Sequence, residues 1–211
     1  MSKTLQVIDS PIGKLEWVFI DGDGKPDLQG VPKYQVDLVL EPEVAEAFRE
    51  KVMSFWEENK PKGAKEPKST GLYPHKVKDE KASSEAGENV YTDTGKTVVR
   101  FKTNTQYQNG DPKVVKVFNS KGSEISLMGK KIGNGSRGRV NGAMDIYNVP
   151  SGKGVTFYLN GVQLSKFVEF TGGVNFDELE DPDGEEFEGV PGNMGGIDNE
   201  EANNETERPR L

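Results

Sequence analysis

The stretch GRVNGAMDIYNVPSGKGVTFYLNGVQLSKFVEF, residues 138–170, decides the fold class. Two segments rich in Val, Ile, Phe and Tyr lie on either side of Pro-Ser-Gly-Lys-Gly, a turn signal. The second segment, 155–170, is long for one strand, and we expect it to bend near Gly161. This end of the chain is therefore predicted to be β structure.

Further strands are predicted upstream, at 14–20, 33–40, 97–107 and 113–120. In the first of them Leu15, Trp17 and Phe19 alternate with other residues, so we expect them on one face. Core positions are expected at Tyr34, Phe101, Phe118 and Phe157.

One helix is predicted over 41–59, where apolar residues recur at three- and four-residue steps. These residues are Val44, Phe48, Val52, Phe55 and Trp56. Residues 60–96 are polar and predict a long irregular loop, and His75, the only histidine, is expected to be an ordinary loop residue. The helix falls between early and late strands without βαβ alternation. The predicted class is mainly β, and this order favours a small mixed or antiparallel barrel over a parallel sheet.

The composition limits what the chain can do. Its 211 residues contain no Cys, which excludes disulfides and thiolate chemistry. The start MSKTLQVIDSPIGK lacks a signal-like apolar run, and no segment is apolar enough to span a membrane. We expect an intracellular protein without membrane contact.

Charge divides the chain at residue 176. Residues 177–211 contain thirteen acidic and two basic side chains, net −11, which leaves +3 on residues 1–176 and −8 overall. Such a like-charge block is usually disordered and is either a solubilising extension or an interaction tail. We expect a folded domain over 1–176 and a disordered acidic tail over 177–211.

The motif Gly133, Gly135, Gly138 has the spacing of a dinucleotide-binding loop. The segment after Gly138 has strand character, whereas that loop requires a helix to begin there. Two interpretations remain: a turn that leads into a strand, or a loop that lets a ligand backbone approach beside cations. The neighbouring Lys130, Lys131, Arg137 and Arg139 suit the phosphates of a polymer.

Catalytic and metal motifs are weak. DGDGKPDLQGVP begins like a calcium loop at Asp21 and Asp23, but Pro32 occupies the position of the bidentate Glu, so a turn is predicted. With one His and no Cys, an enzyme would depend on a carboxylate–metal site at Asp21, Asp23, Asp27 and Asp37. We expect no cofactor, no metal and no catalysis.

The order of several segments resembles the phage replication-type single-stranded DNA-binding proteins. YQVDLVL followed by a helix, VVRFKT, VFNSKG, IGNGSRGRV…IYNVP and GVTFYLNGVQLSKFVEFTGG carry this resemblance over residues 14–173, and the acidic tail completes it. It implies an OB-fold-like antiparallel barrel with one capping helix. It also implies that this barrel binds single-stranded DNA without sequence preference, protects it and promotes annealing during replication and recombination. It also implies that the tail contacts a polymerase, helicase or primase, competes with DNA, and forms dimers.

Such binding requires exposed aromatic rings and cations along the path of the strand. The candidate DNA contacts are Trp17, Phe19, Lys33, Lys62, Lys65, Lys68, Tyr73, Arg100, Lys102, Tyr107, Lys131, Arg137, Arg139 and Tyr147. The sequence leaves open whether Trp17, Phe19 and Tyr147 are exposed or core. The alternative function is a protein-interaction module of a virion or recombination complex that does not bind nucleic acid.

The tail departs from the family pattern at its end. The family typically ends in an aromatic residue, whereas this chain ends in NNETERPRL. Phe187, within DGEEFEG, is a candidate replacement for that aromatic, and Leu211 is the second candidate partner contact. The host-cell cytoplasm is the expected location if a phage encodes the chain.

Overall fold

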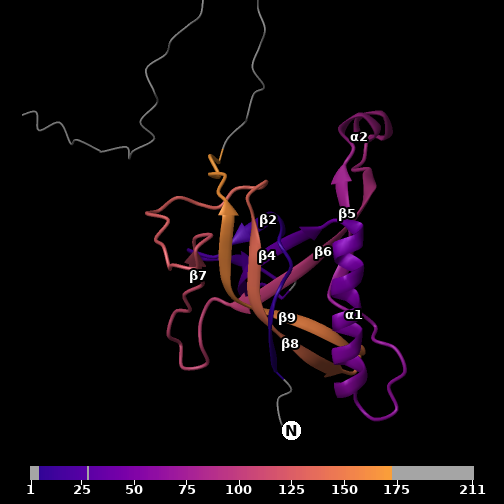
Figure 1. Cartoon of the computed structure of the whole chain (residues 1–211). Helices are drawn as coiled ribbons and strands as arrows, with labels where there is room; N and C mark the ends of the chain where they lie inside the picture. The colour runs from indigo at the N-terminus through magenta and orange to yellow at the C-terminus, as the bar shows by residue number, and fades with distance from the viewer. Residues whose placement is uncertain (1–4, 28, 173–211) are drawn as a thin grey trace, which may run out of the picture. The chain divides into compact units, whose positions relative to one another are not determined.

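A closed barrel forms the centre of the computed structural model, which describes residues 5–27 and 29–172 (Figure 1). Its strands are β2 (Gly13–Phe19), β4 (Pro32–Leu40), β6 (Tyr91–Asn104), β9 (Gly152–Lys166) and β8 (Arg137–Val149). Each pairs with the next, and β8 pairs again with β2. All these pairings are antiparallel except that of β6 with β9, which is parallel. The expected OB-fold-like barrel is confirmed, but the parallel pairing of β6 with β9 departs from the expected antiparallel arrangement.

Four further strands extend this sheet. β1 (Gln6–Asp9) pairs with β8, and β3 (Lys25–Pro26) pairs with β4. β5 (Leu72–Lys78) pairs with β6, and β7 (Lys116–Phe118) pairs with β9. The expected bend near Gly161 is present, because the register between β8 and β9 shifts between Asn141 and Gly142, opposite Gly161 and Leu159.

The helix α1 (Pro42–Asn59) packs on this barrel. Pro42 lies in its first turn, where a missing N–H costs no hydrogen bond. Its buried residues are Ala45, Phe48, Val52, Phe55 and Trp56, and the Phe48 ring stacks on Phe157 of β9 at 5.9 Å between centroids. Val44, which shares the helical period, is exposed, because the buried stripe runs through Ala45.

The barrel interior confirms most of the expected core. Tyr34, Phe101 and Phe157 are buried. Phe118 is half-buried and borders a surface pocket.

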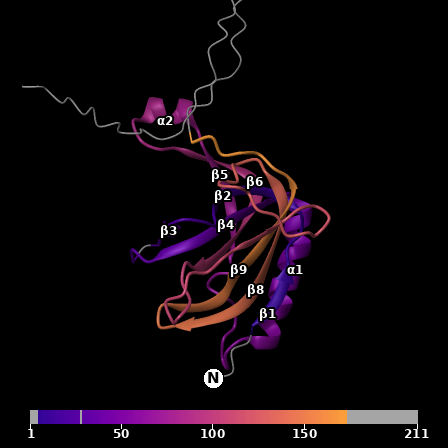
Figure 2. The same cartoon turned by 90° about the vertical axis from the view of Figure 1, so that its left-hand side faces the viewer.

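Residues 60–96 do not form the predicted irregular loop. They contain β5, the helix α2 (Glu80–Ala86) and the start of β6, which begins at Tyr91. Asp79 caps α2 by accepting a hydrogen bond from the Ala82 N–H at 2.9 Å. Figure 2 shows α2 at the tip of the β5–β6 hairpin. Apolar periodicity does not predict this hairpin, because its side chains are mostly polar. Its strands pair through their main chains, and that pairing does not require apolar residues.

His75 is buried within β5, so its prediction as a loop residue is wrong. Its Nδ1 lies 2.8 Å from the Thr94 hydroxyl and its Nε2 lies 3.1 Å from the Glu16 carboxylate. Burial acts to raise the pKa of Glu16, but the hydrogen bonds from Lys14 and His75 outweigh it and hold that pKa below its ordinary value. This contact connects the hairpin to β2, the strand that carries Trp17.

Two expectations concern residues that the structure does not describe. The boundary after residue 176 and the disorder of the acidic tail lie outside the described ranges. Within those ranges, none of the helices has the length and apolar character needed to cross a membrane.

Candidate nucleic-acid interface

Trp17 projects from an irregular point in β2. The register of β2 against β4 shifts between Glu16 and Phe19, and Trp17 has a φ of 48°, in the left-handed region. Leu15 is therefore buried, whereas Trp17 is 53% exposed. The prediction that Leu15 and Trp17 share one face is wrong, because the bulge turns the Trp17 side chain outward.

The loop before β8 holds Trp17 in this conformation. The Asn134 side-chain oxygen accepts a hydrogen bond from the Trp17 N–H at 2.9 Å, and the Gly135 N–H donates to the Leu15 carbonyl at 3.2 Å. A non-glycine residue in the left-handed region costs roughly 1–3 kcal/mol, and such strain is concentrated at functional sites. The conformation presents a large aromatic ring to solvent.

A lysine that the sequence did not indicate lies over the rings of β2. The Lys25 Nζ is 5.3 Å from the centroid of the Trp17 ring and 5.6 Å from that of Phe19. Lys25 belongs to β3, in the segment predicted only as an exposed turn, and it pairs with Lys33 of β4. The pairing of β3 with β4 positions this cation, and the Gly- and Asp-rich sequence of the segment does not predict that pairing.

Lys102 of β6 continues the positive charge. Burial lowers the pKa of its ammonium group, and the neighbouring charges of Arg100 and Lys25 lower it further. The positive charges of Arg100 and Lys25 therefore act at Lys102, and clustered positive charge creates a potential that attracts phosphate. Lys102 and Lys25 therefore belong to one cationic strip.

Beyond Lys102, two tyrosines border a pocket with Arg100. Tyr73, Arg100, Lys102 and Tyr147 line this cavity of about 260 Å³. The Arg100 guanidinium lies 5.9 Å from the centroid of the Tyr73 ring. Burial raises the pKa of Tyr147, and Tyr73 adds to the shift. The structure thus brings together four of the predicted contacts.

Arg100 is already paired within the fold. Its Nε and one terminal nitrogen donate to the two oxygens of Asp37 at 2.8 and 2.6 Å, and Asp37 is buried. The hydrogen bonds from Arg100 to Asp37 raise the pKa of the guanidinium. Arg100 therefore positions Tyr73 more than it offers net charge, and Lys102 is the better candidate for a phosphate contact.

These side chains come from β2, β3, β5, β6 and β8, and Lys102 connects them because it lines the tyrosine pocket and is affected by the charge of Lys25. We call this surface the aromatic-cationic face, and its members are Trp17, Phe19, Lys25, Tyr73, Arg100, Lys102 and Tyr147.

Other predicted contacts lie around this face. Lys131 borders the cavity beside Trp17. Lys33 and Tyr107 border another cavity, where Lys113 lies over the Tyr107 ring at 5.2 Å. The Lys68 ammonium donates to the Ser151 carbonyl at 2.7 Å, which fastens it to the β8–β9 turn.

Lys62, Lys65 and Arg137 are exposed, the two lysines in the loop after α1 and Arg137 at the start of β8.

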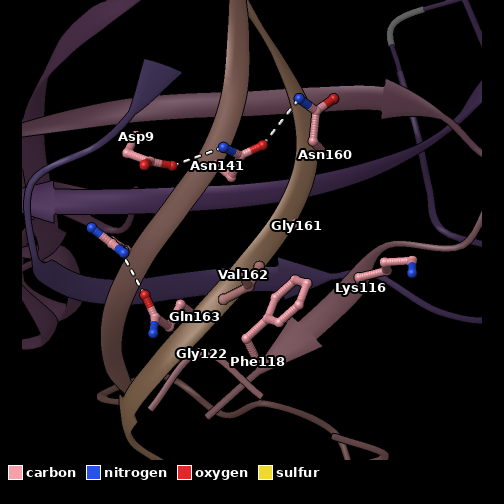
Figure 3. Close-up of a pocket in the computed structure, with 10 residues that line it drawn as sticks. Asp9, Lys116, Phe118, Gly122, Asn141, Asn160, Gly161, Val162 and Gln163 are labelled. Atoms are coloured by element: carbon pink, nitrogen blue, oxygen red, sulfur yellow. Dashed lines mark hydrogen bonds between the residues drawn. The ribbon is translucent and has the colours of Figure 1, made fainter. Parts of the chain in front are cut away.

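Arg139 contributes to a separate pocket. Its Nε donates to the Gln163 side-chain oxygen at 2.7 Å. Figure 3 shows this pocket, in which Asp9, Asn141 and Asn160 form a hydrogen-bonded row and Phe118 lies beside Gly161. The structure does not bring Arg139 together with Lys131 at one cavity, although both flank the same glycines in sequence.

The glycines themselves serve strand packing. A Cβ at Gly133 would lie 3.0 Å from the Glu169 carbonyl, and one at Gly138 would lie 2.1 Å from the main-chain oxygen of Gln163. Gly135 has a φ of 94°, which suits the turn. The strand β8 follows directly, so this segment has the predicted turn into a strand and lacks the helix of a dinucleotide loop.

The predicted acidic cluster does not converge on one point. Asp37 is held by Arg100, while Asp27 accepts hydrogen bonds from the main chain of Gln29 and Val31. Within the described ranges, no group of three or more His, Asp or Glu side chains is arranged to hold a metal ion.

Solved structures share this fold. The chain is similar to gp2.5, a single-stranded DNA-binding protein encoded by bacteriophage T7, with a TM-score of 0.51 and 21% identity over 90% of this chain and 100% of that chain. It is also similar to the single-stranded DNA-binding protein from bacteriophage Enc34 in complex with single-stranded DNA, with a TM-score of 0.55 and 17% identity over 79% and 89% of the two chains. No protein-family model and no curated protein sequence matches the chain.

At these identities the similarity establishes the fold. The chain has the OB-fold-like barrel found in phage single-stranded DNA-binding proteins. The fold implied by the sequence resemblance is confirmed.

Proposed function

We propose that the protein is a non-catalytic single-stranded DNA-binding protein that tolerates any sequence. It protects DNA and promotes strand annealing in phage replication and recombination, in the cytoplasm of the host cell. Lysine side chains neutralise phosphates, and aromatic side chains stack on bases, which is sequence-tolerant because every base has a π-face.

The aromatic-cationic face is the observation that carries this proposal. On this face, stacking groups alternate with cations. Trp17 is exposed and has Lys25 over its ring, and Lys102 leads from there to the pocket of Tyr73 and Tyr147. This is the combination that single-strand binding requires. The similarity in fold to a protein solved in complex with single-stranded DNA supports it.

The acidic tail belongs to the same proposal. Its net charge of −11 opposes the +3 of residues 1–176, so it competes with DNA for the cationic strip. We assign it contacts with a polymerase, helicase or primase through Phe187 and Leu211, and a part in dimerisation.

A fluorescence-anisotropy titration tests the function. Labelled oligo-dT and a duplex of equal length are titrated with the full chain across a salt series. Tight binding to the single strand that weakens steeply with salt supports the proposal. Equal affinity for the duplex would contradict single-strand preference, and no binding to either would favour the protein-interaction module.

A further inference from the structure

A cavity of about 460 Å³ lies beside Trp17, next to the aromatic-cationic face. Three aromatic side chains border it: Trp17 and Phe19 from β2, and Phe170 from the segment after β9. Lys131 and Asn134 contribute polar groups to its lining. A cleft of this size with aromatic walls and a few polar groups is typical of a site for a small planar group.

Phe170 is held at this cavity by main-chain contacts. Its N–H donates to the Lys131 carbonyl at 2.9 Å, and the Gly133 N–H donates to the Val168 carbonyl at 2.8 Å. An ion pair of 2.7 Å between Lys130 and Glu169 adds to this attachment. Gly133 permits it, because a Cβ there would press on the Glu169 carbonyl.

The side chain of Phe170 is nevertheless 58% exposed, about as much as that of Trp17. Because Phe170 lines the same cavity as Trp17 and Phe19, the three rings form one apolar group at the surface, and such groups mark ligand-binding grooves. The sequence suggested nothing of the kind, since Phe170 is only the final apolar residue of the last predicted strand.

Charge around the cavity is suited to a strand of nucleic acid. Lys131 lies at its border, and Lys25 lies over two of its aromatic rings. Asp21 and Asp23 also border it, so phosphates are expected beside the two lysines and away from these carboxylates. The cavity is continuous with the aromatic-cationic face through the rings of β2. A polymer with planar bases and regular negative charge therefore fits better than an isolated apolar ligand.

We propose that this cavity is a nucleobase pocket, in which one unstacked base of a bound single strand lies between Trp17 and Phe170. Lys131 and Lys25 contact the flanking phosphates. The proposal rests on the proposed function and adds to it a site for one base and a contact residue, Phe170. Since bases of every kind present a π-face, the pocket contributes affinity without sequence preference.

The test compares two variants of the full chain, Phe170→Ala and Phe167→Ala. Phe167 is the matched control: it is an exposed phenylalanine three residues away that borders a different pocket. Each is titrated with labelled oligo-dT and with a strand of equal length made of abasic nucleotides, which keeps the phosphates and lacks the bases. Urea unfolding verifies that both variants are folded.

We expect Phe170→Ala to weaken binding to oligo-dT on the order of tenfold, the effect of losing one stacked base. Phe167→Ala should bind as the parent does, and neither variant should change binding to the abasic strand or the salt dependence. Unchanged affinity of Phe170→Ala for oligo-dT would overturn the proposal, as would an equal loss on the abasic strand. If the parent protein itself binds neither strand, the proposed function is what fails.

Discussion

The Asn134 side chain accepts a hydrogen bond from the main-chain N–H of Trp17 at 2.9 Å, across a sequence separation of 117 residues. Trp17 has a φ of 48°, a conformation that costs free energy for a bulky residue. The hydrogen bond offsets part of this cost and keeps the indole ring exposed beside Lys25. Asn134 is thus a positioning residue for the proposed stacking residue.

Replacing Asn134 with Ala should weaken binding to oligo-dT by about tenfold, because Trp17 is then free to leave its exposed conformation. The loss should vanish in a Trp17→Ala background, since Asn134 acts through Trp17. Anisotropy titrations of the four proteins of this double-mutant cycle give the coupling. Additive losses would show that Asn134 contributes by another route.

Tryptophan fluorescence offers an independent check on Trp17. The chain has two tryptophans, and Trp56 is fully buried whereas Trp17 is 53% exposed. We expect acrylamide to quench only the Trp17 part of the emission, and oligo-dT to protect that part. Quenching of Trp17 that oligo-dT leaves unchanged would mean that the strand binds elsewhere, and Trp17→Phe should remove the quenchable emission.

Lys102→Gln should reduce the slope of log affinity against log salt by about 0.7, the contribution of one phosphate on a single strand. Lys51, an exposed lysine of α1, supplies the matched control, and Lys51→Gln should leave the slope unchanged. The two salt series are measured by anisotropy with the same oligonucleotide. Equal slopes for both variants would remove Lys102 from the phosphate path.

Arg100→Gln should destabilise the fold by about 3 kcal/mol, because it leaves the buried Asp37 carboxylate without its partner. Adding Asp37→Asn should restore much of this loss, since no buried charge then remains. Urea unfolding of the single and double variants measures both free energies. A stable Arg100→Gln protein with weaker DNA binding would instead identify Arg100 as a direct contact.

The contact of Glu16 with His75 and Lys14 predicts a pH dependence. The pKa of Glu16 is lowered in the folded state, so its contribution to stability is present above its ordinary value of 4.5 and is lost as the pH falls through the folded pKa. The free energy of unfolding should therefore fall more steeply with acid in the parent than in Glu16→Gln. Parallel curves below about pH 4.5 would contradict this.

Removing residues 177–211 should tighten binding to oligo-dT at low salt, because the tail carries a net charge of −11. The gain should shrink at high salt, where the attraction between tail and body is screened. Anisotropy titrations of the full chain and of a version that ends at Phe176 measure both. Equal affinity would contradict competition, and Phe187→Ala in the full chain tests whether one aromatic is responsible.

Local patterns predicted the strands and the helix where apolar residues recur with a clear period, as at Phe48, Val52 and Phe55 of α1. They failed in two kinds of place. The β5–β6 hairpin is polar, so only the pairing of its main chains reveals it. Trp17 follows the alternation of a strand in sequence, but a bulge, where the Trp17 N–H bonds to the distant Asn134, reverses its direction.

Residue order along the chain is enough to predict β-rich structure with one amphipathic helix, a charge boundary near residue 176 and a supply of aromatic and basic side chains. Periodicity and composition are properties of neighbours along the chain, and these features depend on nothing else. Which side chains share a surface depends instead on how distant strands pair in the folded barrel. Lys25, Trp17 and Phe170 lie near one another at the surface, whereas Arg139 lines another pocket and Arg100 is paired with Asp37. The reason is that barrel closure and strand register join segments more than a hundred residues apart.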